Sequence, residues 1–320
     1  MENQKERYQK FVKLCLEQLK LRLGEEFTVQ TNAILKNNSM IMEGVVILKD
    51  GMKITPNIYL EEYFREYEND VDMESIVDEI LTVYQEKILE KADMDIEFTY
   101  EKMKNVIIYR LVNYEKNTEL LKNSPYVKLL DLAITFHCLV QEKEEAIGTI
   151  RITNEHMKLW NVTIQDLLKC AKENTPRLLP VSIRRMEEVI EELIQSNGIE
   201  HSELSEVLSL ENLGDNEFES EEDELANEMY ILSNTIGING AGCILYDGIM
   251  KNFAKVLKSD FYILPSSIHE VILLSARNAV DKGQLEEMVT EINQEQVPYE
   301  EVLSNHVYYY SKNENQIKCL

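Results

Sequence analysis

Between Arg185 and Lys251 the chain has no lysine or arginine, while 17 aspartate and glutamate residues fall in that interval. A block of like charge repels itself and prefers water to a packed interior, so it is typical of an extended or mobile connector. We therefore predict that residues 199–227 form an acidic flexible connector. It would join an N-terminal α+β region, residues 1–198, to a C-terminal α+β domain, residues 228–320.

The whole chain is also acidic, with 58 acidic against 33 basic residues and a net charge of −25. Such a charge repels phosphate backbones and anionic lipid, so we expect neither direct nucleic-acid binding nor membrane binding. The expected partner is a protein, and the sequence does not identify a small-molecule ligand. An alternative interpretation of the acidic block is a nucleic-acid mimic acting on a DNA-binding protein.

Three features indicate a soluble protein of the cytoplasm. The first seven residues are polar and resemble no signal peptide. The longest mostly apolar run, Leu129–Val140, has twelve residues, well short of the roughly 20 that a membrane span needs. The five cysteines are scattered, without a C-x-x-C pair, as expected of reduced thiols.

Hydrophobic periodicity predicts the elements of the N-terminal region. They are a helix over 1–23, a hairpin over 27–48, a helical segment over 61–91, a hairpin over 127–152 and helices over 154–195, the last of them running from Ser182 to Gln195. Strands and helices without strict βαβ alternation favour an α+β fold with mainly antiparallel sheets flanked by helices.

The C-terminal domain repeats this pattern of strand, hairpin and helix. Strands are predicted at 229–233, 243–246, 261–264, 271–274 and 307–310, with helices over 248–257 and 285–293. A duplication of the N-terminal region is conceivable, but no residues of the two parts align.

Short phrases along the chain carry a resemblance to a known family. They are TPNIYLE at 55–61, RLVNYEKN at 110–117, DLA at 131–133, LWNVT at 159–163, AKENTP at 171–176 and YILPSSIHEVIL at 262–273. Together they resemble an uncharacterised family of hypothetical proteins from gut-type Firmicutes, designated only as a domain of unknown function. The resemblance covers most of the chain outside the connector. It implies kinship and no activity, because the family has no established catalytic residues.

Several motifs fail the tests for known cofactor and metal sites. The glycines of 237–242 are spaced G-x-x-G-x-G and precede a predicted strand, whereas a dinucleotide site needs G-x-G-x-x-G opening a helix. His269-Glu270 lacks the second histidine of a zinc-protease helix, because Leu273 occupies that position. The five histidines show no ligand spacing. We therefore expect no cofactor and no metal.

The remaining candidate site is a polar cluster between two apolar strands: Ser266, Ser267, His269 and Glu270. Two hydroxyls, an imidazole and a carboxylate could bind a polar ligand or supply an acid–base pair. The same residues could instead close a tight hairpin by satisfying local backbone groups. A concave, partly exposed pocket around 265–270 would favour an enzyme.

No coherent catalytic constellation emerges, so the leading hypothesis is a non-catalytic binding or accessory protein of the cytoplasm. An enzyme with a cryptic site around Ser266, His269 and Glu270 is the alternative. Whether the chain is an enzyme stays open, with the balance against it.

The acidic block gives a first prediction. A Glu-specific protease should cut first within Ile199–Asn227 and leave two folded pieces, because a segment without cations cannot neutralise itself on burial. Limited proteolysis followed by mass spectrometry measures the order of cleavage. Early cleavage within Leu129–Ile152 would contradict the two-part organisation.

Overall fold

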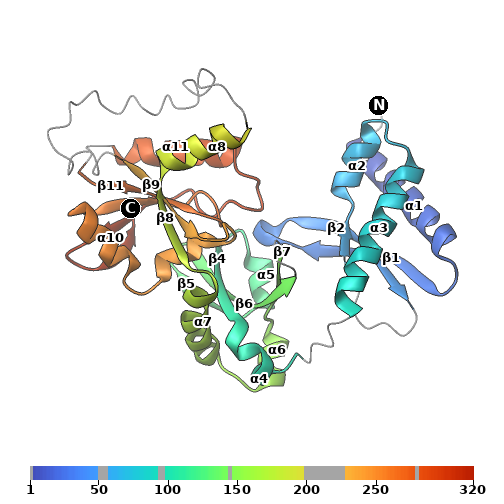
Figure 1. The fold of residues 1–320 in the computed structure, drawn as a ribbon, viewed down its shortest axis with the longest axis horizontal. Helices are drawn as coiled ribbons and strands as arrows, with labels where there is room; N and C mark the ends of the chain where they lie inside the picture. Colours follow the sequence, from blue (N-terminus) through green and yellow to red (C-terminus); the bar gives the residue numbers. More distant parts are fainter. Residues whose placement is uncertain (1–2, 50–56, 93–97, 143–145, 198–227, 278–280) are drawn as a thin grey trace. The chain divides into compact units, whose positions relative to one another are not determined.

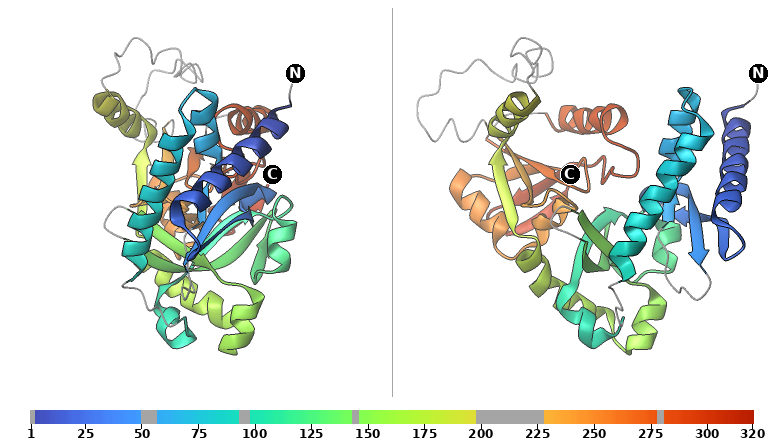
Figure 2. Two further views of the ribbon diagram at one scale, coloured as in Figure 1. Left: turned by 90° about the vertical axis from the view of Figure 1, so that its right-hand side faces the viewer. Right: turned by 45° about the vertical axis from the view of Figure 1, so that its right-hand side comes forward.

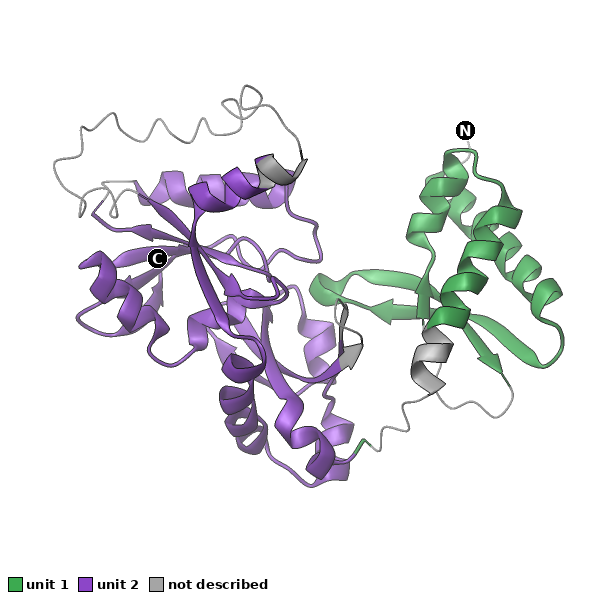
Figure 3. Ribbon diagram, in the orientation of Figure 1, with its two compact units in different colours: residues 1–98 green, residues 99–320 purple. Residues whose placement is uncertain are grey.

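The computed structural model describes residues 3–49, 57–92, 98–142, 146–197, 228–277 and 281–320. The chain divides into two compact units, residues 1–98 and residues 99–320 (Figures 1 and 3). Each unit has helices and antiparallel strands of its own, which makes the protein α+β, as the sequence predicts. None of the described helices is long and apolar enough to cross a membrane.

Unit 1 is a three-stranded antiparallel sheet of order β1-β2-β3 with three helices. Its elements are α1 (Gln4–Leu23), β1 (Phe27–Leu35), β2 (Ile41–Lys49), β3 (Asn57–Tyr59), α2 (Glu61–Glu68) and α3 (Met73–Ala92). Gly24 ends α1 with φ of 81°, a conformation that glycine adopts without the penalty of a Cβ atom. The helical segment predicted over 61–91 forms two helices, α2 and α3.

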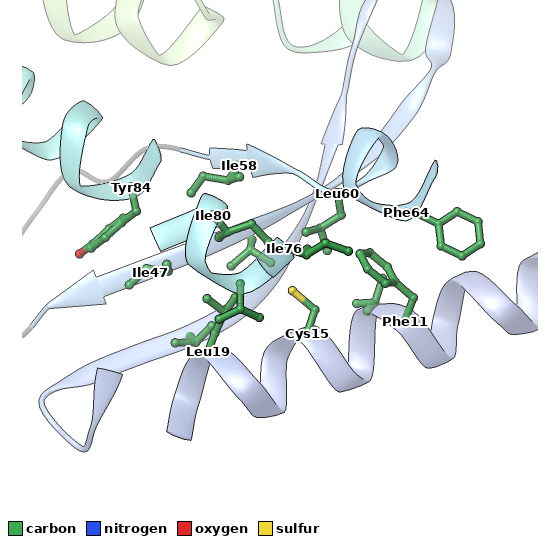
Figure 4. Packing of buried hydrophobic residues seen from close by; sticks show 14 residues of the cluster. Phe11, Cys15, Leu19, Ile47, Ile58, Leu60, Phe64, Ile76, Ile80 and Tyr84 are labelled. Atoms are coloured by element: carbon green, nitrogen blue, oxygen red, sulfur yellow. The ribbon is translucent and has the colours of Figure 1, made fainter. Parts of the chain in front are cut away.

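One hydrophobic cluster holds unit 1 together (Figure 4). Phe11, Cys15 and Leu19 recur at helical spacing on α1 and pack against Ile76 and Ile80 of α3 and the strands. Because this core is complete within residues 8–84, unit 1 has its own source of hydrophobic stabilisation.

Unit 2 begins with a sheet in which β6 pairs with β4, β5 and β7. The elements are α4 (Tyr100–Met103), β4 (Ile107–Asn113), α5 (Thr118–Lys122), β5 (Tyr126–Leu129), β6 (Leu132–Glu142), β7 (Ala146–Arg151), α6 (Asn154–Trp160) and α7 (Ile164–Leu178). The single strand predicted over 127–140 is split, because Leu130 turns the chain with φ of 55°.

The second sheet of unit 2 has six antiparallel strands in the order β13-β12-β10-β11-β9-β8. Its elements are β8 (Val181–Arg185), α8 (Met186–Asn197), β9 (Met229–Asn234), the 3₁₀ helix η4 (Gly240–Leu245), α10 (Ile249–Leu257), β10 (Phe261–Leu264), β11 (Val271–Ser275), α11 (Lys282–Glu295), β12 (Tyr308–Ser311) and β13 (Gln316–Cys319). Helices α8 and α11 lie over one face of this sheet (Figure 2).

Buried polar contacts join the two sheets of unit 2. The carboxylate of Asp131, between β5 and β6, accepts hydrogen bonds of 2.6 Å from the hydroxyls of Ser304 and Tyr308. The side-chain amide of Asn113, at the end of β4, donates to the carbonyl of Leu303 over 3.0 Å. Hydrogen bonds to a charged acceptor are the stronger kind, so these contacts fix the orientation of one sheet on the other.

The boundary between the units does not lie where the sequence predicts it. Residues 181–185 form β8 rather than the start of a helix, and β8 pairs with β9 in a register that joins Val181 to Asn234 and Arg185 to Tyr230. The chain on either side of 199–227 therefore belongs to one unit, and a cut there leaves β8 paired with β9. Residues 199–227 themselves lie outside the described residues, so a flexible connector remains a prediction. Residues 243–245 belong to the 3₁₀ helix η4, and Tyr246 is its C-cap, instead of forming the predicted strand.

Candidate functional site

The four candidate residues lie on the loop 265–270, which joins β10 to β11. Its backbone is hydrogen-bonded to two other segments. The Ile268 N–H donates to the carbonyl of Glu301 over 2.8 Å, and the Ile268 carbonyl accepts from the Ala241 N–H over 3.2 Å. The loop is thus not a tight two-residue turn. It is an ordered connection clamped between the start of η4 and residues 301–304.

The structure separates the four side chains into two pairs. Ser266 and Glu270 line a pocket on the sheet, whereas Ser267 and His269 are held by local contacts. The buried hydroxyl of Ser267 accepts a 2.9 Å hydrogen bond from the His269 N–H. Among the described residues, neither serine hydroxyl hydrogen-bonds to the imidazole, so the cluster forms no serine–histidine pair.

Both ring nitrogens of His269 have neighbours. Its Nδ1 accepts from the Asn239 N–H over 3.3 Å, and its Nε2 lies 3.4 Å from Oε1 of Glu301. Acceptance at Nδ1 requires the tautomer that carries its proton on Nε2, facing the carboxylate. The imidazole therefore ties the loop before η4 to residue 301.

Close approach of the backbone explains a glycine of the G-x-x-G-x-G motif. A Cβ atom on Gly240 would lie 2.1 Å from the Ser233 Oγ and 2.5 Å from the His269 carbonyl oxygen. Those two groups are themselves joined by a 2.8 Å hydrogen bond. The motif therefore seats η4 against β9 and the candidate loop, and the helix that follows it is a 3₁₀ helix rather than one that opens a dinucleotide site.

The pocket beside this loop has a volume of about 520 Å³ and lies on the face of the six-stranded sheet next to α8. Strands β8 and β9 supply its floor through Ser182, Arg184, Ile231 and Ser233, and the side chain of Val189 comes from α8. The end of β9 and the loop after it complete the rim with Asn234 and with Thr235, Ile236 and Gly237. The lining thus combines apolar walls with hydroxyl and amide groups, the usual composition of a ligand site.

Glu270 is the charged residue of the pocket lining that is available to a ligand. Burial raises the pKa of its carboxyl most; the nearby Glu301 raises this pKa further, while His269 and a hydrogen bond from Ser267 lower it. The other charged group in the lining, Arg184, forms an ion pair with Glu192 of α8. A half-buried carboxylate with a raised pKa favours a cationic or hydrogen-bond-donating neighbour.

Sequence reasoning missed the residues of β8 and β9 that form the floor. Ser182 and Arg184 were assigned to a helix, and Ser233 carried no motif. Alternation of Ser182, Ile183 and Arg184 is the one signal of a strand there, and a stretch of five residues is too short to separate a strand from a helix by periodicity. In the part of the chain that the structure describes, no group of three or more His, Cys, Asp or Glu residues could hold a metal ion.

One family model matches residues 8–312, and it describes a family of unknown function, DUF5688. No curated protein matches the chain, and no solved structure does.

Replacing His269 with alanine should lower the free energy of unfolding by about 1–2 kcal/mol, because the Asn239 N–H loses its acceptor. Chemical denaturation measures this change. The matched control is Ser266→Ala, which should stay within about 0.5 kcal/mol because Ser266 lines the open pocket. An unchanged or raised midpoint for His269→Ala would contradict the structural role of the imidazole.

Two glycines of the same motif should differ sharply in their tolerance of alanine. Gly240→Ala should destabilise the protein by about 3 kcal/mol or more, because its Cβ has no room. At Gly237 nothing lies within 4 Å of the new Cβ, so only the left-handed φ of 75° adds a cost of about 1–2 kcal/mol. Equilibrium unfolding of both variants tests the difference, and equal losses would argue against the close approach at Gly240.

Proposed function

We propose that this chain, which belongs to the family of unknown function DUF5688, is a binding protein whose pocket beside Glu270 takes a small molecule carrying an amine or amidine group. The pocket is the observation that carries the proposal. Its volume of about 520 Å³ falls in the range of small-molecule sites, which runs from about 300 to 1,000 Å³.

The charge in the pocket supports a donor-rich ligand. Glu270 is half-buried with a carboxyl pKa raised chiefly by burial, so a ligand cation would relieve the cost of ionising it there. Arg184 is already neutralised by Glu192, which leaves no free cation in the lining to attract an anion. The hydroxyls of Ser182 and Ser266 can orient the rest of a polar ligand.

The arrangement of the candidate residues favours binding over nucleophilic catalysis. A serine nucleophile needs a base within hydrogen-bond reach, and the imidazole of His269 is directed to Asn239 and Glu301 instead. A second candidate function rests on Glu270 alone: a carboxyl of raised pKa in a pocket is suited to general acid–base catalysis. Ser266 would then position the substrate.

The proposal also covers the location of the protein in the cell and its partner. The five free cysteines suit a reducing compartment, so we place the protein in the cytoplasm. As a ligand-binding protein, it would act as an accessory to a protein partner. A nucleic-acid mimic would rest on residues 199–227, which lie outside the described residues.

A thermal-shift experiment on the full chain tests the pocket. The probes are agmatine, lysine, glucose and citrate at equal ionic strength. Agmatine or lysine at about 100 times its Kd should raise Tm by about 5 °C or more, because only the native state binds it. Glucose and citrate should have little effect.

The variant Glu270→Gln should lose the shift given by the amine probes. The control Glu287→Gln makes the same change of charge at an exposed position on α11 and should keep it. Absence of a shift with both amines, or a shift that survives Glu270→Gln, would contradict the proposal. Turnover of a bound probe that Glu270→Gln abolishes would favour the acid–base alternative.

A further inference from the structure

A second group of polar side chains lies on the four-stranded sheet of unit 2, away from the pocket. Antiparallel pairing places Arg110 of β4 opposite Thr135 of β6, and His137 of β6 opposite Arg151 of β7. Directly paired residues, and residues two apart on one strand, point to the same face of a sheet. The two arginines and the histidine therefore share one face.

The contacts of these side chains bring them together over β6. An Nη2 of Arg110 donates a hydrogen bond to the hydroxyl of Thr149, which is on β7, so the guanidinium reaches from β4 across β6. The Thr135 hydroxyl lies 3.1 Å from Nε2 of His137. The imidazole thus has Arg151 opposite it on β7, while the guanidinium of Arg110 crosses the same strand β6 to reach Thr149.

Three nitrogen atoms of this group are buried and have no hydrogen-bond partner: Nε of Arg110, Nε of Arg151 and Nδ1 of His137. A buried donor without an acceptor costs about 1–3 kcal/mol, and more when the group is charged. Three such atoms on one face of one sheet are therefore expensive for the fold unless something binds to them.

The charges of Arg110, His137 and Arg151 also favour a bound partner. Burial lowers the pKa of Arg110 to about 10 and that of Arg151 in the same direction, and both guanidinium groups stay charged at neutral pH. Burial, together with Arg110 and Arg151, lowers the pKa of His137 well below its usual value, so the imidazole is neutral. Two like charges thus flank a neutral donor or acceptor.

The chain has carboxylates in excess, and several of its arginines pair with one. Arg7 and Arg22 of unit 1 and Arg184 and Arg185 of unit 2 all form ion pairs with aspartate or glutamate. Within the described ranges, no carboxylate lies within ion-pair distance of Arg110 or Arg151. In a protein of net charge −25, two half-buried arginines in this situation are suited to an anion that comes from outside.

We propose that Arg110, His137 and Arg151 form a binding site for a phosphate-type oxyanion, either inorganic phosphate or the phosphate group of a small metabolite. The two guanidinium groups match a doubly charged anion and donate to its oxygens through their Nε–H groups. The Thr135 hydroxyl donates to the carbonyl of Arg110 over 3.5 Å, so the Nε2–H of the neutral imidazole donates to this hydroxyl, and its Nδ1 accepts a hydrogen bond from a protonated oxygen of the anion. This site lies on a different sheet from the pocket beside Glu270 and does not depend on the function proposed for it.

Isothermal titration of the full chain with sodium phosphate, at constant ionic strength and pH 7.5, tests the site. Wild type should bind phosphate with one site per chain, and sulfate should compete. Acetate, with one charge and two oxygens, should bind at least tenfold more weakly. Arg151→Gln should weaken phosphate binding by about tenfold or more, the loss expected for one charge-assisted contact.

Two control variants show whether a loss of phosphate binding is specific to this site. One tests a general effect of charge, and the other tests an effect of the pocket beside Glu270. Arg277→Gln removes the same charge at an exposed position of unit 2, and Glu270→Gln alters the pocket; both should leave the phosphate Kd within about twofold, since neither contacts the anion. Arg110→Gln should also weaken phosphate binding by about tenfold or more. Arg110 is the more buried of the two arginines. If Arg110→Gln fails to fold, Arg151→Gln and phosphorus NMR of wild type with phosphate test the site.

Absence of phosphate binding to wild type would overturn the proposal, because the three nitrogens would then be satisfied from within the chain or by water. So would binding that survives Arg151→Gln, or an equal loss in Arg277→Gln. Acetate binding as tightly as phosphate would overturn the choice of a phosphate-type anion in favour of a carboxylate.

Discussion

The pairing of β8 with β9 is the interaction on which the architecture of unit 2 depends. Its register brings Ser182 opposite Ser233 and Arg184 opposite Ile231, which forms the floor of the pocket. It also places α8 over the sheet directly after β8, so that Val189 closes one wall. The pairing joins residues far apart in the chain and makes one unit of the segments on both sides of 199–227.

A second constraint holds the candidate loop at the end of this sheet. Gly240 lets η4 approach β9 so closely that the Ala241 N–H reaches the carbonyl of Ile268. His269 is then bonded to Asn239 on one side and faces Glu301 on the other. With the backbone fixed in this way, the pocket receives Ser266 and Glu270, while the other two polar groups serve the fold. The cluster predicted as one group is therefore divided between a pocket lining and local contacts.

Charge is distributed unevenly at every level of this protein. The acidic excess lies mainly between Arg185 and Lys251, and the pocket keeps an available carboxylate. The opposite holds on the four-stranded sheet, where Arg110 and Arg151 flank a neutral imidazole. Partly buried charges cost a fold free energy unless they are paired, so both proposals rest on the same physical ground.

The sequence by itself determined what depends on near neighbours. Period-3.6 and period-2 patterns identified α1 and the β1–β2 hairpin. The fold class followed from these elements, and kinship to a family of unknown function followed from short phrases. Only the tertiary structure decided that 182–185 is a strand, that the candidate cluster splits, and that Arg110 reaches Thr149 of β7 across β6. Each of these results from pairing between distant segments, and local periodicity carries no information about a partner that is far away in the chain.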